Sequence, residues 1–196
     1  MNRRRRQVAL AGHCGDVETA RSALVDADSH VRELALGACS RLGALHDQDV
    51  RAALRDADPG VRRRAAELAA TRRGVDLRDA LHDPDLTVVE QAAWSCGEHG
   101  SVDDDVLALL IELAQTADAA LVRESAVAAL GAVGDPRGLP AILHGCRDQP
   151  AVRRRAVLAL APFEGDDVEA ALDAALSDRD WQVRQAAEDL QRASRG

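Results

Sequence analysis

One five-residue pattern, Val-Arg-x-x-Ala, recurs along the chain at intervals of about thirty residues, and it constrains the fold more than any other feature. Its six copies begin at Val31, Val61, Val89, Val122, Val152 and Val183. Each copy follows a turn rich in Asp, and the third carries Glu90 where the others carry Arg. A unit of this length cannot bury its apolar face alone, so neighbouring units must stack to build a continuous core.

Each unit is predicted to contain a short outer helix and a longer inner helix that starts at the anchor valine. Counting from Val31, small or apolar residues return at Ala35, Ala38 and Cys39, which is the spacing of a helix with one buried face. The predicted outer helices include 47–55, 166–176 and a longer one at 102–115. Left-handed caps are expected at the glycines that follow the inner helices: Gly43, Gly74, Gly100, Gly134 and Gly165.

The composition favours stacked helices and excludes several other classes. Aromatic residues make up only 2% of the chain, against 46% hydrophobic residues, so the core must be thin and close-packed. The apolar content is too high for a disordered chain, and no run of about 18 apolar residues is present to span a membrane. Because the cysteines form no Cys-x-x-Cys pair and no export signal precedes them, we expect free thiols and a cytoplasmic location.

The helical pair with Asp in the turn and Val-Arg opening the second helix resembles the HEAT repeat, most closely the short bacterial PBS-lyase HEAT-like form. This resemblance implies an all-α, right-handed α-α superhelix, a HEAT-like solenoid of about six helical pairs. Residues 1–14 would form an N-terminal capping helix within a single domain, 1–196. The repeats are expected near 15–43, 44–74, 75–100, 101–134, 135–164 and 165–196. The family's inner helices line the concave side, its usual binding surface.

Charge is divided unevenly between the two kinds of helix. The chain carries 25 basic residues, all of them Arg, and 33 acidic residues, for a formal net charge of −8. The predicted inner helices hold 13 of the Arg but only 7 of the acidic residues. An Arg in the first helical turn is disfavoured by the helix dipole unless a carboxylate compensates it. In HEAT repeats such side chains form a ladder between units, which the resemblance assigns here to Asp28, Arg32, Asp58, Arg62, Asp118, Arg123, Asp148, Arg153, Asp180 and Arg184.

Two residues after each anchor the side chain should point away from the core, because the helical wheel has advanced by about 200°. The resulting polar ridge consists of Glu33, Arg63, Gln91, Glu124, Arg154 and Gln185. Its mixed charges suit a protein partner better than a phosphate backbone. Trp94 follows its anchor by five residues, so it either packs between inner helices or forms a binding hot spot. We therefore expect a scaffold or adaptor that binds a protein or peptide through Arg63, Arg154 and Trp94.

Two other interpretations stay open at this point. The first is a nucleic-acid-binding module, similar in architecture to the HEAT-like alkylpurine DNA glycosylases. It would use the basic side chains Arg3, Arg4, Arg5, Arg6, Arg64 and Arg155. The acidic total and the scarcity of aromatic residues weigh against it. The second is a phycobilin-lyase-like or regulatory enzyme subunit, an interpretation that rests on the resemblance to the PBS-lyase HEAT-like repeat.

No motif in the sequence supports catalysis. The His and Cys residues are scattered over different repeats, so we expect no four ligands to converge on a metal. HEAT-repeat di-iron hydroxylases are similar in architecture but use His-Glu dipeptides as ligands, and none occurs here. A Gly-rich phosphate loop and a Gly-x-Ser-x-Gly elbow are also missing from the sequence. We expect a non-enzymatic protein without cofactor, metal or catalytic residues, and the pattern leaves its oligomeric state open.

Overall fold

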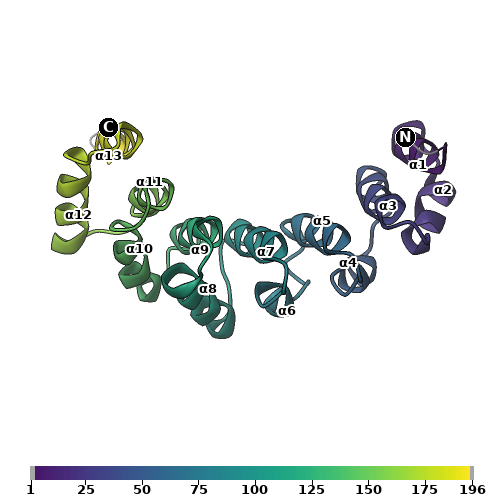
Figure 1. Cartoon of the computed structure of the whole chain (residues 1–196), viewed down its shortest axis with the longest axis horizontal. Helices are drawn as coiled ribbons and strands as arrows, with labels where there is room; N and C mark the ends of the chain where they lie inside the picture. The colour runs from purple at the N-terminus through teal and green to yellow at the C-terminus, as the bar shows by residue number, and fades with distance from the viewer. Residues whose placement is uncertain (1–2, 195–196) are drawn as a thin grey trace. The chain divides into compact units, whose positions relative to one another are not determined.

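The computed structural model describes residues 3–194 (Figure 1). Within this range the chain forms thirteen α-helices and two short 3-10 helices, η1 and η2, and it forms no strand. The all-α class predicted from the sequence is therefore confirmed. The chain divides into two compact units, residues 1–92 and 93–196, and the boundary falls inside helix α7 (Leu86–Glu98).

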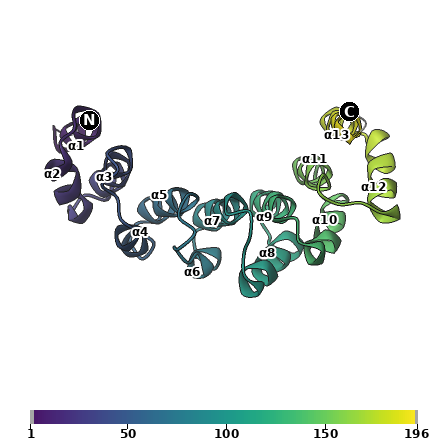
Figure 2. The same cartoon turned by 180° about the vertical axis from the view of Figure 1, so that it is seen from behind.

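In the first unit, inner and outer helices alternate along the chain and form two layers (Figures 1 and 2). The inner helices are α1 (Arg3–Cys14), α3 (Ser29–Arg41) and α5 (Pro59–Ala69). The outer elements are α2 (Val17–Ser22), η1 (Ala23–Val25), α4 (Asp47–Ala53) and α6 (Arg78–Leu81). Helix α1 packs against α3, and α3 packs against α5, so each inner helix covers the side of the next.

The second unit repeats this alternation after the C-terminal half of α7. Its inner helices are α9 (Ala120–Val133), α11 (Pro150–Ala159) and α13 (Trp181–Ser194). Its outer elements are α8 (Asp104–Thr116), η2 (Pro136–Gly138), α10 (Leu139–Gly145) and α12 (Asp166–Leu176). Helix α9 packs against both α8 and α11, and α13 packs against α11 and α12, which gives the same two layers.

Each inner helix that carries an anchor valine begins two residues before it, and an Asp side chain caps most of them. The Asp28 carboxylate accepts the backbone N–H of His30 at 3.0 Å, and the Asp58 carboxylate accepts that of Gly60 at 2.9 Å. Such a cap satisfies one of the donors that the first helical turn leaves unpaired. Pro59 then occupies the first helical position, where its missing N–H carries no cost.

The third repeat is shifted by one residue relative to the sequence-based alignment. The backbone N–H of Val88 bonds to the Asp85 carbonyl at 3.0 Å, just as that of Val31 bonds to the Asp28 carbonyl at 2.9 Å. The anchor is therefore Val88, and the prediction of Val89 is wrong. Both adjacent valines are buried, so their apolar character could not distinguish the two registers.

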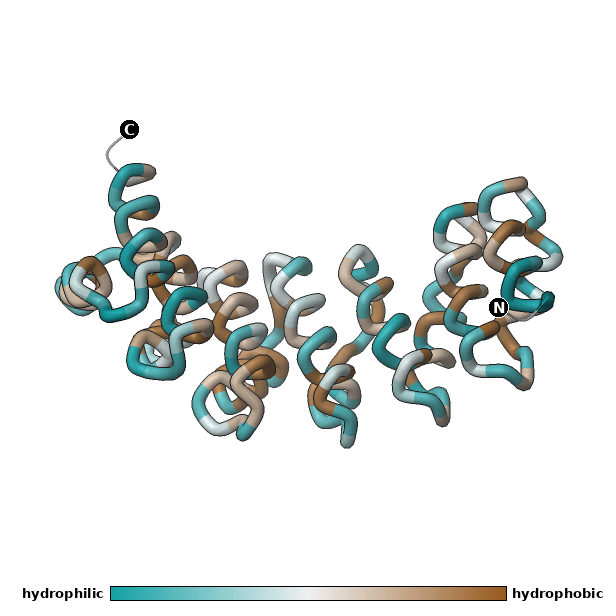
Figure 3. Tube along the Cα trace, turned by 45° about the horizontal axis from the view of Figure 1, so that its top comes forward, coloured by the Kyte–Doolittle hydropathy of each residue, from teal (hydrophilic) through white to brown (hydrophobic). Residues whose placement is uncertain are grey.

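The core lies between the layers and consists of small side chains. All six anchor valines, with Val88 as the third, are at most 1% exposed. Figure 3 shows apolar and polar stretches alternating along each helix, as expected for helices with one buried face. Glycine allows the closest approach: a Cβ on Gly131 would lie 2.6 Å from the Ala159 Cβ, and one on Gly97 would lie 2.9 Å from the Ala129 Cα. The inner helices of the second unit thus pack almost backbone to backbone.

Three of the five predicted glycine caps adopt left-handed backbone conformations, with φ of 65° at Gly43, 66° at Gly100 and 68° at Gly134. The prediction is wrong for Gly74, because α5 already ends at Ala69 and a turn fills the intervening residues. It is also wrong for Gly165, whose φ of 118° belongs to the residue that begins α12.

Candidate interaction surface on the inner helices

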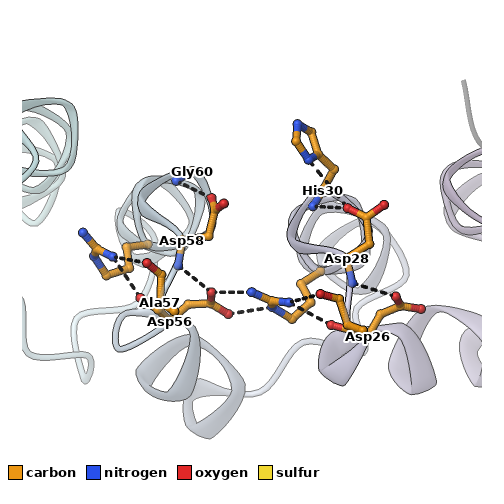
Figure 4. Close-up of polar contacts among 10 residues, drawn as sticks. Asp26, Asp28, His30, Asp56, Ala57, Asp58 and Gly60 are labelled. Atoms are coloured by element: carbon orange, nitrogen blue, oxygen red, sulfur yellow. Dashed lines mark hydrogen bonds and ion pairs between the residues drawn. The ribbon is translucent and has the colours of Figure 1, made fainter.

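In four repeats the Arg that follows the anchor valine, here called the anchoring Arg, binds two successive turns of the stack. Arg32 donates from Nε and Nη2 to the Asp56 carboxylate of the next repeat, at 2.7 and 2.6 Å. Its Nη1 donates to the Asp26 carbonyl in the turn of its own repeat, at 2.8 Å. Figure 4 shows how Asp56 also accepts the backbone N–H of Asp58, which holds the carboxylate in place. The guanidinium therefore joins one turn to the next through a planar pair of charge-assisted hydrogen bonds.

The same geometry recurs in both units. The further bidentate pairs are Arg62 with Asp83, Arg123 with Asp148, and Arg153 with Asp178. At the equivalent places in the third and fourth repeats the chain carries Val89 and Ala117, which have no charge. With Val88 as the anchor, the residue that follows it is Val89, so the third repeat has no Arg at this place.

The carboxylates of the ladder differ from those predicted, except at Asp148. Asp58 and Asp180 accept backbone N–H groups at the start of their inner helices, two residues beyond the carboxylates that bind Arg. Asp28 also caps its helix, and it binds Arg5 of α1 as well. The Asp118 carbonyl accepts from Arg123 at 3.0 Å, whereas the carboxylate that binds Arg123 through two bonds is that of Asp148. The error arose because both Asp of an Asp-x-Asp turn fit the sequence pattern equally well.

Arg184 of α13 is the anchoring Arg of the sixth repeat. Its Nη1 donates to the Asp178 carbonyl of its own turn at 2.7 Å, as the other anchoring arginines do. No further repeat follows α13 within the described residues to offer a carboxylate. Of the two kinds of bond that the other anchoring arginines make, Arg184 therefore shows the one within its own turn.

The arginines stabilise the charged form of their carboxylate partners. Hydrogen bonds from the guanidinium groups hold the pKa values of Asp56, Asp83, Asp148 and Asp178 below that of a free Asp. Conversely, the bond to Asp83 raises the pKa of Arg62. The ladder carboxylates therefore stay ionised well into the acidic range.

The predicted ridge residues lie beside one another in neighbouring inner helices and pair across them. Arg63 lies 3.8 Å from the Glu33 carboxylate in the first unit. In the second unit Glu124 lies between two cations, 4.0 Å from Arg154 and 3.7 Å from Arg155. These long, partly exposed contacts are weak, so the groups can exchange partners at little cost. Whether they bind another protein stays a prediction.

The structure places Gln91 beside the ridge and Gln185 on it. Because the third anchor is Val88, the position two residues later belongs to Glu90, and Gln91 instead lies half-buried beside it. In the last repeat the exposed Gln185 donates to the Asp189 carboxylate at 2.9 Å, so its amide is held along its own helix. The ridge position of the third repeat is therefore acidic, where the sequence alignment placed a neutral Gln.

Trp94 is not enclosed between inner helices, so the expectation of a buried packing residue is not met. In the corrected register it is the sixth residue after its anchor, and it is 43% exposed. The fifth position is taken by Ala93, which is fully buried like Leu36 and Val127 in other repeats. The sixth position faces away from the core, because the wheel has advanced by about 240° from the anchor. The ring therefore lies on the open face of α7.

Sequence reasoning missed a second exposed apolar residue on the same face. Leu158 is the sixth residue after Val152, so it is equivalent to Trp94, and it is 39% exposed. Between them in the series of inner helices lies Ala128, at the same position of α9. We call Trp94, Ala128 and Leu158 the apolar row. The signal was present in the sequence, but the register error placed Trp94 and Leu158 at different wheel angles.

The N-terminal arginines are not all free for a nucleic acid. Arg4 binds Asp26 at 3.2 Å, and Arg5 binds Asp28 through two bonds of 2.9 and 3.0 Å. Helix α1 thus uses these cations to attach itself to the first repeat. Arg3 and Arg6 are exposed, and Arg64 binds Glu67 at 2.6 Å within its own helix.

The described range, 3–194, gives little support for a metal site, a reactive thiol or a membrane-spanning helix. No group of three or more His, Cys, Asp or Glu side chains is arranged to hold a metal ion there. The cysteines are free thiols; Cys39 and Cys96 are buried, and burial raises the pKa of Cys146 to about 11. Among the described helices, none combines the length and the apolar character needed to cross a membrane.

Comparison with known proteins agrees with the helical-pair geometry. A model of HEAT repeats matches residues 48–131 and 75–161, which together span more than half of the chain. The X-ray structure of YibA from Escherichia coli is similar at a TM-score of 0.73 and 20% identity, covering 94% of this chain and 74% of YibA. An engineered protein is similar at a TM-score of 0.64 and 18% identity, over 96% of this chain and 60% of its own. No curated protein matches the chain. The chain belongs to the HEAT repeat family.

Proposed function

We propose that the chain is a non-enzymatic HEAT-repeat scaffold that binds a protein or peptide partner on the open face of its inner helices. The observation that carries this proposal is the apolar row of the second unit, in which Trp94 and Leu158 are 43% and 39% exposed at equivalent positions. Large apolar side chains placed in series on one face mark interaction surfaces more often than isolated ones do.

The composition of the row supports a protein partner. A partly exposed Trp offers a large rigid surface and one indole donor, which is typical of residues that dominate binding energy. Ala128 takes the same position in α9, between the helices that carry the two larger side chains, and it is only partly buried. Glu124, Arg154 and Arg155 lie on the same helices and supply a charged border whose weak ion pairs can open for a partner.

The charge distribution favours this reading over nucleic-acid binding. Arg4, Arg5, Arg64 and Arg155 lie near acidic side chains of the same unit, which lowers the positive potential that a phosphate backbone requires. A titration against duplex DNA tests the alternative directly. Binding that weakens steeply between about 50 and 200 mM salt would support the nucleic-acid module instead.

The proposal is tested by photocrosslinking in cells of the source organism. The variant Ala128→p-benzoylphenylalanine places the crosslinker in the middle of the row, and we expect a discrete protein adduct. Adding Trp94→Ala should reduce the adduct about tenfold or more, because a hot-spot aromatic contributes about 2 kcal/mol or more. Trp181→Ala removes an exposed Trp outside the row and serves as the matched control.

Two outcomes count against the proposal. An adduct that is equally strong with Trp94→Ala shows that the row does not bind the captured protein. Arg154→Glu should also weaken the adduct while the far-ultraviolet circular dichroism stays unchanged, and an unaffected adduct removes the charged border from the binding surface.

A further inference from the structure

Two arginines of the first unit converge on one point of the inner face, around Gly37 of α3. A Cβ added to Gly37 would lie 2.9 Å from Nη2 of Arg64 and 3.6 Å from Nη1 of Arg41. The guanidinium groups come from different inner helices, α5 and α3, yet they lie against the same patch of helix backbone. Two cations are thus held as close neighbours by the fold.

Glycine is what makes this arrangement possible. Gly37 lies inside α3, where glycine costs about 1 kcal/mol relative to alanine, so its presence calls for a reason. At Gly12 of α1 an added Cβ would lie 2.8 Å from Nη2 of Arg41, and it would also lie 2.9 Å from the Ala38 Cα of α3. The Arg41 guanidinium therefore lies across two helices, over two positions that carry no side chain.

The charges around this pair do not cancel. Glu67 binds Nη1 of Arg64 at 2.6 Å, and Nη2 of the same guanidinium is the group that lies over Gly37. Arg41 is exposed, and no carboxylate of residues 3–194 forms an ion pair with it. Like charges at this separation repel, and an anion placed between them removes the repulsion.

We propose that Arg41 and Arg64 form an oxyanion site that takes a phosphate monoester, carried by a phosphorylated side chain of the protein partner. Two guanidinium forks match a compact dianion, which accepts parallel charge-assisted hydrogen bonds from both. The phosphodiester backbone of a nucleic acid fits less well, because each diester carries one charge and two free oxygens, whereas a monoester carries up to two charges and three free oxygens. The identity of the carrier rests on the proposed function, whereas the anion site itself does not.

The site is tested with inorganic phosphate as the probe. We would titrate the full chain at pH 8 and constant ionic strength and follow the Nε–Hε resonances of its arginines. Saturable shifts of Arg41 and Arg64 are expected, and Arg41→Gln should weaken binding about tenfold or more, because each charge-assisted hydrogen bond contributes about 1.5–3 kcal/mol. Affinity should fall between pH 8 and pH 5, as phosphate becomes a monoanion while the arginines stay charged.

Arg55→Gln is the matched control, since it removes an exposed Arg of the same unit that pairs with Asp79 only at 3.7 Å. Gly37→Ala keeps every charge but displaces Nη2 of Arg64, and it should weaken phosphate binding while thermal melting confirms the fold. The proposal is overturned if Arg55→Gln weakens binding as much as Arg41→Gln, or if chloride at the same ionic strength produces the same shifts.

A second pair of probes separates the sources of the anion. A tripeptide containing phosphoserine should bind, and the same peptide with serine should not. Duplex DNA that binds more tightly than the phosphopeptide and depends on Arg41 would overturn the assignment to a phosphorylated protein. If Trp94→Ala leaves partner capture unchanged while phosphate still binds at Arg41, the proposed function fails and the anion site stands.

Discussion

Arg62 reaches from its own repeat to Asp83 in the next and binds it through two parallel hydrogen bonds, Nε to Oδ2 at 2.7 Å and Nη2 to Oδ1 at 2.8 Å. Both side chains are largely buried, with 14% and 7% of their surface exposed. Asp83→Ala would leave the guanidinium buried without its partner, so we expect a loss of about 2–3 kcal/mol in the free energy of unfolding. Urea denaturation followed by circular dichroism measures it.

Asp79→Ala provides the control for that experiment, because Asp79 is 91% exposed and lies 3.7 Å from Arg55. An exposed pair of this kind contributes about 0–1 kcal/mol. Equal losses in the two variants would show that the ladder pair contributes no more than a surface contact.

Acid should destabilise the fold through the same carboxylates. The folded-state pKa values of Asp56, Asp83, Asp148 and Asp178 are lowered by their arginine partners, so the unfolded chain binds more protons than the folded chain below about pH 5. The stability they contribute is complete above the unfolded pKa of about 3.9 and is lost as the pH falls through the lower folded value. Urea midpoints at pH 7, 5, 4 and 3 should therefore fall mainly below pH 5.

A variant that lacks one Arg–Asp pair of the ladder makes the pH prediction specific. In Arg62→Met combined with Asp83→Leu, one depressed carboxylate is gone, so the decline between pH 5 and pH 3 should be shallower than in the unmodified chain. An unchanged slope would mean that other acidic groups cause the acid sensitivity.

The repeat pattern predicted much of the fold because the spacing of its apolar residues shows which side of each helix is buried. The anchor valines and the alanines four residues later specify the inner helices directly. The register of the third repeat could not be obtained in this way, because Val88 and Val89 are both apolar and both buried. The backbone bond from Val88 to Asp85 distinguishes them, together with the cap that the Asp85 carboxylate places on the N–H of Thr87.

The candidate surface was predicted less well for two physical reasons. In an Asp-x-Asp turn either carboxylate can cap a helix or bind an Arg, and the choice depends on the distance to the next repeat, which local sequence does not contain. The convergence of Arg41 and Arg64 on Gly37 involves two helices and a missing side chain, so no single segment reveals it. Trp94 was identified, but its exposure depended on the register.

Close packing at Gly131 reverses the usual effect of a glycine-to-alanine change in a helix. Alanine ordinarily stabilises a helix interior by about 1 kcal/mol relative to glycine. Here the new Cβ would lie 2.6 Å from the Ala159 Cβ and 2.7 Å from its Cα, and overpacking of this kind costs about 1–3 kcal/mol. We therefore expect Gly131→Ala to lower the melting temperature. A raised melting temperature would contradict the close approach of α9 and α11.

Tryptophan fluorescence tests the exposed face of α7 before any partner is known. Trp94 is 43% exposed and Trp181 is 64% exposed, so both indoles contact water. In the single-tryptophan variants Trp94→Phe and Trp181→Phe, emission should be red-shifted and readily quenched by acrylamide, with Trp181 quenched more strongly because it is the more exposed. Blue-shifted, protected emission from Trp94 in Trp181→Phe would place the ring inside the stack. It would then be unavailable to a partner, and the apolar row would lose its largest side chain.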